Sequence, residues 1–185
     1  MKTAITGGIG SGKSYVCRLL RQRGVEVYDC DAAAKRLMRT SVALRRQLTE
    51  LIGHSAYLSD GALNKTAVAS FLLASRENAG RLNAIVHPAV ADDFIASGMQ
   101  WMECAILYES GFDRLVDRVV VVTAPYELRL SRIVSRDCIS AAKAREWIDC
   151  QLPQTELQRR ADIEIVNDGV CNLSEQIDKI VKNSK

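Results

Sequence analysis

A glycine-rich run near the amino terminus constrains this chain more than any other feature. Residues 7–14 read Gly-Gly-Ile-Gly-Ser-Gly-Lys-Ser and match the pattern G-x-x-x-x-G-K-[ST], directly after the β-branched run Thr3–Thr6. Glycines let backbone N–H groups turn toward phosphate oxygens, and a following helix adds the positive end of its dipole. The spacing of Val16, Leu19 and Leu20 predicts that helix. The run therefore predicts a loop that binds nucleoside triphosphate, rather than a glycine-rich turn without a ligand.

The residues of this loop have separate expected roles. The Lys13 ammonium would reach the β- and γ-phosphates, and the Ser14 hydroxyl would ligate the Mg²⁺ that bridges them. The expected cofactors are therefore ATP and Mg²⁺. The expected nucleotide-binding residues within the loop are Ile9, Gly10, Ser11, Gly12, Lys13 and Ser14.

Length, charge and cysteine usage narrow the class of protein. The chain has 185 residues, 48% of them hydrophobic, which is enough for one compact domain. A formal net charge of +3 is too small to indicate nucleic-acid binding. The glycine-rich run begins too early for a signal peptide, and no apolar run reaches membrane-spanning length, so we expect a cytoplasmic protein. The six cysteines form no C-x-x-C pair, which favours reduced structural thiols over a metal cluster.

Short apolar segments alternate with longer helical patterns along the chain. Such alternation predicts a parallel five-stranded sheet flanked by helices, the α/β architecture of P-loop nucleoside triphosphate hydrolases and kinases. The expected strands are Thr3–Thr6, Val25–Tyr28, Cys104–Tyr108, Val119–Thr123 and Ile163–Val166.

Two segments exceed what a minimal P-loop domain needs. We expect a single domain, residues 1–185, with a core at about 1–31 and 99–185. The long stretch at about 32–98 predicts a helical substrate-binding insertion. Residues of about 136–152, with basic Arg136, Lys143 and Arg145, predict a lid over phosphates, the alternative being an ordinary surface helix.

An acid pair follows the second expected strand. In an open α/β sheet ligands collect at the carboxyl ends of the strands, so Asp29 and Asp31 are expected near the γ-phosphate, both on one side of the strand. Such carboxylates can accept the proton of an acceptor hydroxyl and help to hold the metal. The alternative is that Asp31 only caps a helix starting at Ala32. Cys30, between the acids, would make activity sensitive to oxidation if its thiol were exposed.

Several separate motifs together give a family resemblance that covers most of the chain. The chain resembles the dephospho-coenzyme A kinase family in its phosphate loop and in its Asp-x-Asp pair with the following alanine-rich helix. Further matching segments are Asn83–Pro88, with its His-Pro pair, Ile106–Ser110, the lid start Arg132–Asp137, Gln151 with Pro153, Ala161-Asp162 and Asn167–Gly169.

This resemblance implies transfer of the ATP γ-phosphoryl group to the ribose 3′-hydroxyl of dephospho-coenzyme A, the last step of coenzyme A synthesis. It implies Asp31 as the base that orients this hydroxyl, with Asp29 supporting the metal or the acceptor. Lys13 and Arg136 would stabilise charge on the transferring group.

Other polar residues are weaker candidates for the site. By the resemblance Asn167 and Gly169 would bind the nucleotide. His87, Glu109 and Arg159 are candidates for contact with substrate. Their alternatives are a buried or capping imidazole, an exposed loop acid and a solvated arginine.

Two rival functions use the same loop. One is another P-loop kinase, acting on a nucleoside, shikimate or gluconate. The other is a GTP-dependent switch, but the chain has no Asn-Lys-x-Asp segment, and Asn64-Lys65-Thr66-Ala67 lacks the acid. By the resemblance, the expected partner is the small molecule dephospho-coenzyme A, without nucleic acid or membrane, and the expected state is a monomer or small homo-oligomer.

Overall fold

The chain folds into two compact units, seen here in a computed structural model that describes residues 1–182. One unit combines Met1–Tyr28 with Met99–Lys185, and the other is Asp29–Gly98. No helix within the described residues combines the length and apolar character needed to cross a bilayer.

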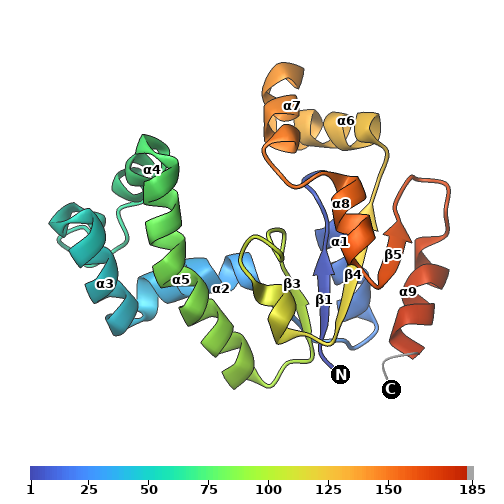
Figure 1. Cartoon of the computed structure of the whole chain (residues 1–185), viewed down its shortest axis with the longest axis horizontal. Helices are drawn as coiled ribbons and strands as arrows, with labels where there is room; N and C mark the ends of the chain where they lie inside the picture. Colours follow the sequence, from blue (N-terminus) through green and yellow to red (C-terminus); the bar gives the residue numbers. More distant parts are fainter. Residues whose placement is uncertain (183–185) are drawn as a thin grey trace. The chain divides into compact units, whose positions relative to one another are not determined.

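A parallel five-stranded sheet forms the centre of the first unit (Figure 1). Its strands are β1 Thr3–Thr6, β2 Val27–Asp29, β3 Trp101–Glu103, β4 Arg118–Thr123 and β5 Ile163–Val166. Their order in the sheet is β2-β3-β1-β4-β5, and Thr3 pairs with Trp101 on one side and Arg118 on the other. Every residue of β1 and β4 is buried, as expected for strands covered on both faces. The predicted fold class is confirmed.

Five α-helices accompany this sheet within the described residues, together with the 3₁₀ turn η2, Phe112–Leu115. They are α1 Lys13–Gln22, α6 Tyr126–Asp137, α7 Ala141–Asp149, α8 Gln154–Arg160 and α9 Leu173–Lys182. The main core packs Val16 and Leu20 of α1 with Ile177 of α9 against Ile5 and Val120 of the sheet. Figure 1 shows α6 and α7 together beyond the carboxyl end of β4. They share a smaller apolar cluster that includes Ile133 and Ile148.

One expected strand is wrong. Residues 105–108 form turns, Cys104 has no regular secondary structure, and β3 lies just before it. Cys104 and Leu107 are buried, which explains the apolar run. However, the Phe112 N–H donates to the Leu107 carbonyl group, a bond of a helical turn rather than of a sheet ladder. The other four strands are confirmed to within two residues at each end.

The second unit is helical. It contains α2 Cys30–Thr40, α3 Val42–Ile52, the 3₁₀ turn η1 His54–Ala56, α4 Lys65–Ala74 and α5 Arg76–Ser97. Side chains cap all four α-helices: Asp29 caps α2, the Ser41 hydroxyl accepts from the Leu44 N–H, Asn64 caps α4 and Ser75 caps α5. The unit buries its own apolar side chains, among them Leu44, Leu48, Val68, Leu82, Val86 and Phe94.

Candidate active site

The phosphate loop connects the end of β1 to the start of α1. Gly10 and Gly12 have φ values of +79° and +92°, which favour glycine. A Cβ atom on Gly10 would lie 2.7 Å from the Arg129 carbonyl oxygen, so the loop sits directly against α6. Glycine is thus required at Gly10 both by backbone conformation and by close approach.

Two arginines of α6 hold outward-facing carbonyl groups of the loop. Arg129, which is buried, donates from Nε to the carbonyl oxygen of Ile9 at 2.9 Å. Arg132 donates to the carbonyl oxygens of Gly10 and Ser11 at 3.2 and 3.3 Å. A trans peptide points its C=O and its N–H in opposite directions, so these contacts turn the following N–H groups away from α6.

Free backbone donors line the inner side of the loop. Within residues 1–182, the N–H groups of Gly10, Gly12, Lys13 and Ser14 are among those of the loop that donate to no protein acceptor. They stand at the N-terminus of a ten-residue helix, where the helix dipole favours an anion. The loop therefore fits the phosphates of ATP.

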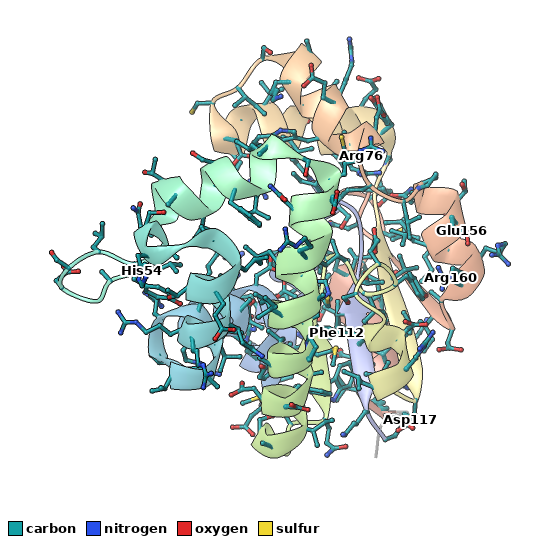
Figure 2. The ribbon with its side chains drawn as sticks, turned by 60° about the vertical axis from the view of Figure 1, so that its left-hand side comes forward. His54, Arg76, Phe112, Asp117, Glu156 and Arg160 are labelled. Atoms are coloured by element: carbon teal, nitrogen blue, oxygen red, sulfur yellow. The ribbon has the colours of Figure 1, made fainter. Side chains whose placement is uncertain are left out.

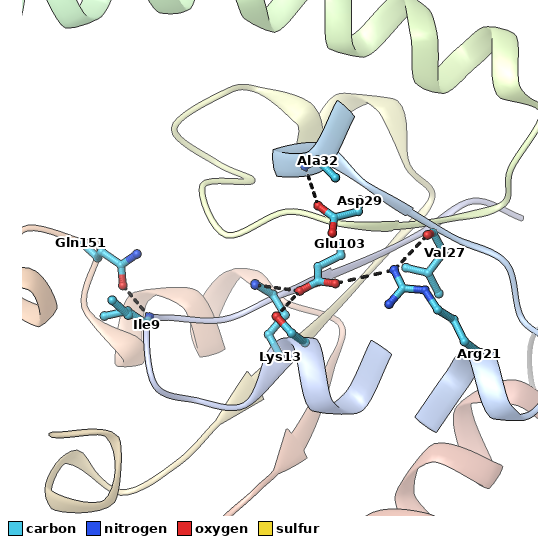
Figure 3. A network of polar contacts seen from close by, with 9 residues as sticks. Ile9, Lys13, Arg21, Val27, Asp29, Ala32, Glu103 and Gln151 are labelled. Atoms are coloured by element: carbon cyan, nitrogen blue, oxygen red, sulfur yellow. Dashed lines mark hydrogen bonds and ion pairs between the residues drawn. The ribbon is translucent and has the colours of Figure 1, made fainter. Parts of the chain in front are cut away.

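The buried carboxylate of Glu103 contacts the side chains of Lys13 and Ser14 at the start of α1 (Figure 3). Its Oε1 atom lies 2.6 Å from the Ser14 hydroxyl and 3.1 Å from Lys13 Nζ. Arg21 Nη2 lies 3.9 Å from Oε2. Glu103 ends β3, and because β3 pairs with β1, the sheet brings this acid to the start of α1.

The charge state of Glu103 follows from these contacts. Burial alone would raise the pKa of its carboxyl group. The charge of Lys13, together with hydrogen bonds from Ser14, Lys13 and Cys17, outweighs burial and holds the pKa below its ordinary value. Glu103 is therefore an anion at neutral pH. Burial raises the pKa of the neighbouring Cys17 thiol, which stays protonated.

The same atoms suit a divalent cation. The Ser14 hydroxyl and the Glu103 carboxylate are hard oxygen donors, and Mg²⁺ uses one or two such protein ligands together with phosphate oxygens and waters. The described residues hold no cluster of three or more His, Cys, Asp or Glu side chains that could bind a metal by themselves. The donor set thus fits a magnesium ion shared with a nucleotide, rather than a resident metal.

Sequence reasoning missed Glu103 and singled out Glu109. The misplaced strand explains this. An expected strand at Cys104–Tyr108 ends just before Glu109, whereas the real strand, Trp101–Glu103, ends at Glu103. Glu109 is exposed and lies in the turns after β3, not at a strand end.

The acid pair after β2 differs from expectation in its local structure. Asp29 is the last residue of β2 and caps α2, its Oδ1 accepting from the Ala32 N–H at 2.9 Å. The helix begins at Cys30, one residue before Asp31, so the alternative in which Asp31 only caps the helix is wrong. Strand alternation does not relate the two acids, because Asp31 is exposed in the first helical turn. The thiol of Cys30 is buried, which removes the condition for sensitivity to oxidation.

Asn167 is brought to the loop, whereas Gly169 is not. Asn167 is buried after β5 and donates from Nδ2 to the Ser11 carbonyl oxygen at 2.7 Å. Its side chain also occupies the space that a Cβ on Gly12 would need. Gly169 is a turn residue with φ of +86° and open space around its Cα.

The remaining candidates are Arg136 and Arg159 in the first unit and His87 in the second. Arg136 lies in the last turn of α6, and its guanidinium is paired with Asp137 at 2.7 Å. Arg159 on α8 pairs with Glu156, which is labelled in Figure 2. Arg159 also lines a surface hollow together with Arg118, the first residue of β4, at the opposite end of the strand from the loop. His87 is half-buried in α5, and burial lowers the pKa of its imidazole.

Comparison with known proteins agrees with this geometry. The model of the dephospho-CoA kinase family matches residues 1–172. The dephospho-CoA kinase of Bacteroides fragilis is 41% identical over 192 residues, covering 98% of this chain and 91% of that protein. That of Salinibacter ruber is 38% identical over 91% of this chain and 89% of that protein.

Solved structures give the same assignment of fold. The crystal structure of TT1252 from Thermus thermophilus superimposes with a TM-score of 0.85 and 29% identity, covering 100% of this chain and 97% of that one. Shikimate kinase from Acinetobacter baumannii shares the fold alone, with a TM-score of 0.56 and 18% identity, over 99% of this chain and 92% of that one. With a P-loop kinase fold and a family match over nearly its whole length, the chain belongs to the dephospho-CoA kinase family, a family of transferases.

Proposed function

We propose that this protein transfers the γ-phosphoryl group of ATP to the ribose 3′-hydroxyl of dephospho-coenzyme A, giving coenzyme A and ADP. The family match over residues 1–172 is the observation that carries the identity of the acceptor. The free N–H groups of the phosphate loop support the nucleotide half of the reaction.

The first unit would bind the nucleotide. The free N–H groups of Gly10, Gly12, Lys13 and Ser14 would bind phosphate oxygens, and Lys13 would leave Glu103 for the negatively charged phosphates. Ser14 and Glu103 would hold Mg²⁺, with Asp29 as a further candidate. When bound, Mg²⁺ neutralises charge on the β- and γ-phosphate oxygens. Asn167 would keep the loop in place through its bond to Ser11.

The reaction itself requires a base and charge stabilisation. Asp31 would take the proton of the 3′-hydroxyl. The hydroxyl oxygen would bond to the γ-phosphorus while the bond between this phosphorus and the bridging oxygen of ADP breaks. Lys13 and Arg136 would stabilise negative charge on the transferring group. Arg136 would exchange its partner Asp137 for the phosphates. It stands at the start of the segment of about 136–152, which we propose as the lid.

Substrate recognition and cellular context complete the proposal. The helical segment of about 32–98, including His87, would contact the acceptor, within a single domain whose core is about 1–31 and 99–185. All six cysteines are free thiols, which favours a reducing compartment, and we propose a cytoplasmic enzyme. We propose a monomer or small homo-oligomer.

The test is ADP release that depends on Mg²⁺ and ATP, with dephospho-coenzyme A compared against adenosine, AMP, shikimate and gluconate. Mass analysis of the product locates the new phosphate. Selective 3′-phosphorylation of dephospho-coenzyme A supports the proposal, and turnover only with another acceptor contradicts it. The rival shikimate kinase activity would appear directly in this panel.

Variants assign the roles of the acids. Asp31→Asn is expected to keep ATP binding and to lower turnover by roughly a hundredfold or more, because it removes the proton acceptor. Asp29→Asn keeps the cap of α2, so any loss of activity there reports on metal or acceptor rather than on folding. Glu103→Gln is expected to raise the Mg²⁺ requirement, whereas Glu109→Gln is not. The reverse result would favour Glu109, as the sequence alone did.

A further inference from the structure

Side chains outside the phosphate loop hold both of the peptide units that meet at Ile9. Gln151 Oε1 accepts from the Ile9 N–H at 2.7 Å, and Arg129 Nε donates to the Ile9 carbonyl oxygen at 2.9 Å (Figure 3 shows the first contact). The two partners flank the segment that contains α7, because Arg129 lies on α6 and Gln151 follows the end of α7. Both ends of that segment therefore contact the same loop residue.

The contacts at Ile9 affect a phosphate donor. The carbonyl group of Ile9 and the N–H of Gly10 belong to one planar peptide and point in opposite directions. With the carbonyl group held on Arg129, the free N–H of Gly10 is turned to the inner side of the loop. The Gly8–Ile9 and Ile9–Gly10 peptides are rigid planes that meet at the Cα atom of Ile9. A displacement of the Ile9 N–H would therefore be taken up by rotation about φ and ψ of Ile9, which also changes the direction of the Gly10 N–H.

Steric contacts restrict the same segment. A Cβ on Gly8 would lie 2.6 Å from a terminal nitrogen of Arg129 and 3.4 Å from Gln151 Oε1. The two side chains therefore pack against the backbone of Gly8 as well as bonding to Ile9. Gln151 thus contacts the loop both through a hydrogen bond at Ile9 and through close packing at Gly8.

Gln151 has a natural comparison three residues later. Gln154 also uses its Oε1 atom to accept a backbone N–H, that of Ala124 at 3.2 Å, and Ala124 lies outside the loop. The two residues are chemically identical and belong to the same connection between α7 and α8. They differ in their backbone partner, which is Ile9 of the loop for Gln151 and Ala124 for Gln154, so the same substitution at both positions tests the contact with Ile9.

We propose that Gln151 is a positioning residue of the phosphate loop: it fixes the Gly8–Ile9 peptide, and thereby the adjoining Ile9–Gly10 peptide that Arg129 holds, so that the N–H of Gly10 faces the phosphates of the nucleotide. A neutral acceptor suits this place, because a carboxylate would repel the phosphates that the loop binds. Gln151 would also join the carboxyl-terminal end of the proposed lid to the loop. The proposal rests on the nucleotide half of the proposed function and is independent of the acceptor.

The first test is binding, which needs no acceptor. Gln151→Met keeps the length of the side chain and removes the oxygen. Calorimetry with the Mg²⁺ complex of adenylyl imidodiphosphate is expected to show affinity weaker by about five- to tenfold, corresponding to part of one charge-assisted hydrogen bond. Gln154→Met is expected to bind the analogue within about twofold of the unchanged protein.

Kinetics separates positioning from general destabilisation. With dephospho-coenzyme A, Gln151→Met is expected to lower kcat about tenfold while the KM for the acceptor stays within about twofold. Binding and kcat equal to those of the unchanged protein would overturn the proposal, as would equal losses in Gln154→Met. If the unchanged protein binds the analogue but does not phosphorylate dephospho-coenzyme A, the proposed acceptor fails while the binding test still judges Gln151.

A second variant covers the case in which Gln151→Met does not fold. Gln151→Glu retains an acceptor oxygen for the Ile9 N–H at the same chain length, so we expect a melting temperature close to that of the unchanged protein. Its charge is expected to weaken binding of the analogue, and less so at high salt because ions screen it. Binding that is unchanged at low salt would contradict the proposal.

Discussion

Lys13 and Glu103 depend on each other's charge at the scale of single residues. In the folded protein the pKa of Glu103 is lowered, so its ionised form adds stability above the ordinary carboxyl pKa. That stability is lost as the pH falls through the lowered pKa. Without Lys13, burial is the largest remaining influence and opposes ionisation.

Lys13→Met should therefore cost more stability at pH 7 than at pH 4. We expect a loss of about 1–3 kcal/mol at neutral pH, because the variant removes the nearer cation of a buried carboxylate and leaves only Arg21 at 3.9 Å. Urea unfolding at the two pH values measures the difference. Lys143→Met, which removes an exposed lysine paired with Glu146, is expected to change stability by less than about 0.5 kcal/mol at either pH. Equal losses for Lys13→Met at both pH values would contradict the assignment.

Gly12 and Gly24 share a left-handed backbone but differ in their surroundings. A Cβ on Gly12 meets Asn167, whereas Gly24 has open space. Gly24→Ala is expected to cost about 1 kcal/mol from backbone strain alone. Gly12→Ala is expected to cost about 1–3 kcal/mol more, because the Asn167 contact with the loop must also shift. Thermal unfolding of both variants measures the difference, and equal losses would show that crowding at Gly12 is unimportant.

At the scale of elements, the junction after α6 carries unfavourable backbone geometry. Cys138 follows the last residue of α6 with φ of +53°, and it is the one residue other than glycine with positive φ in the described chain. This position after a helix favours glycine. The junction leads into α7, so its stability bears on the segment proposed as a lid.

Cys138→Gly is expected to stabilise the protein by about 0.5–1 kcal/mol, since glycine adopts the left-handed conformation without strain. Cys150→Gly supplies the matched comparison, because Cys150 is another exposed thiol after a helix but has a right-handed backbone. It is expected to destabilise by roughly 0.5–1 kcal/mol through added freedom in the unfolded chain. Chemical unfolding distinguishes the two, and a loss of stability in Cys138→Gly would refute the strain argument.

At the scale of the whole molecule, burial divides the thiols into two classes. Cys17, Cys30 and Cys104 are buried, whereas Cys138, Cys150 and Cys171 are exposed. The division follows the core, because the first three lie on α1, α2 and directly after β3.

We expect three thiols to react rapidly with a disulfide reagent in the native protein and six after denaturation, because reactivity requires access and a thiolate. Mass spectrometry identifies the labelled residues. Rapid native labelling of Cys30 would contradict the buried position and would revive the idea of an oxidation-sensitive acid pair. A Cys30→Ala variant is expected to have the same activity as the unchanged protein, and peroxide is expected to affect the two proteins equally.

Local patterns in the sequence determined the phosphate loop, the helix after it and four of the five strands. Each of these depends on neighbouring residues: glycines that free the backbone, apolar spacing and alternation of strands with helices. The resemblance placed the chain in its family before any geometry was known. The exception, Cys104–Tyr108, shows that an apolar run reports burial but not the hydrogen-bond pattern.

Tertiary structure alone decided which distant residues serve the loop. Glu103 lies 90 positions from Lys13 and meets it because β3 pairs with β1, and Gln151 lies 142 positions from Ile9. Such contacts depend on the order of strands and on the path of the chain after α7, neither of which is encoded in the spacing of nearby residues. The sequence by itself thus determined that the chain binds a triphosphate, while the fold decided which carboxylate and which amide hold the loop and its lysine.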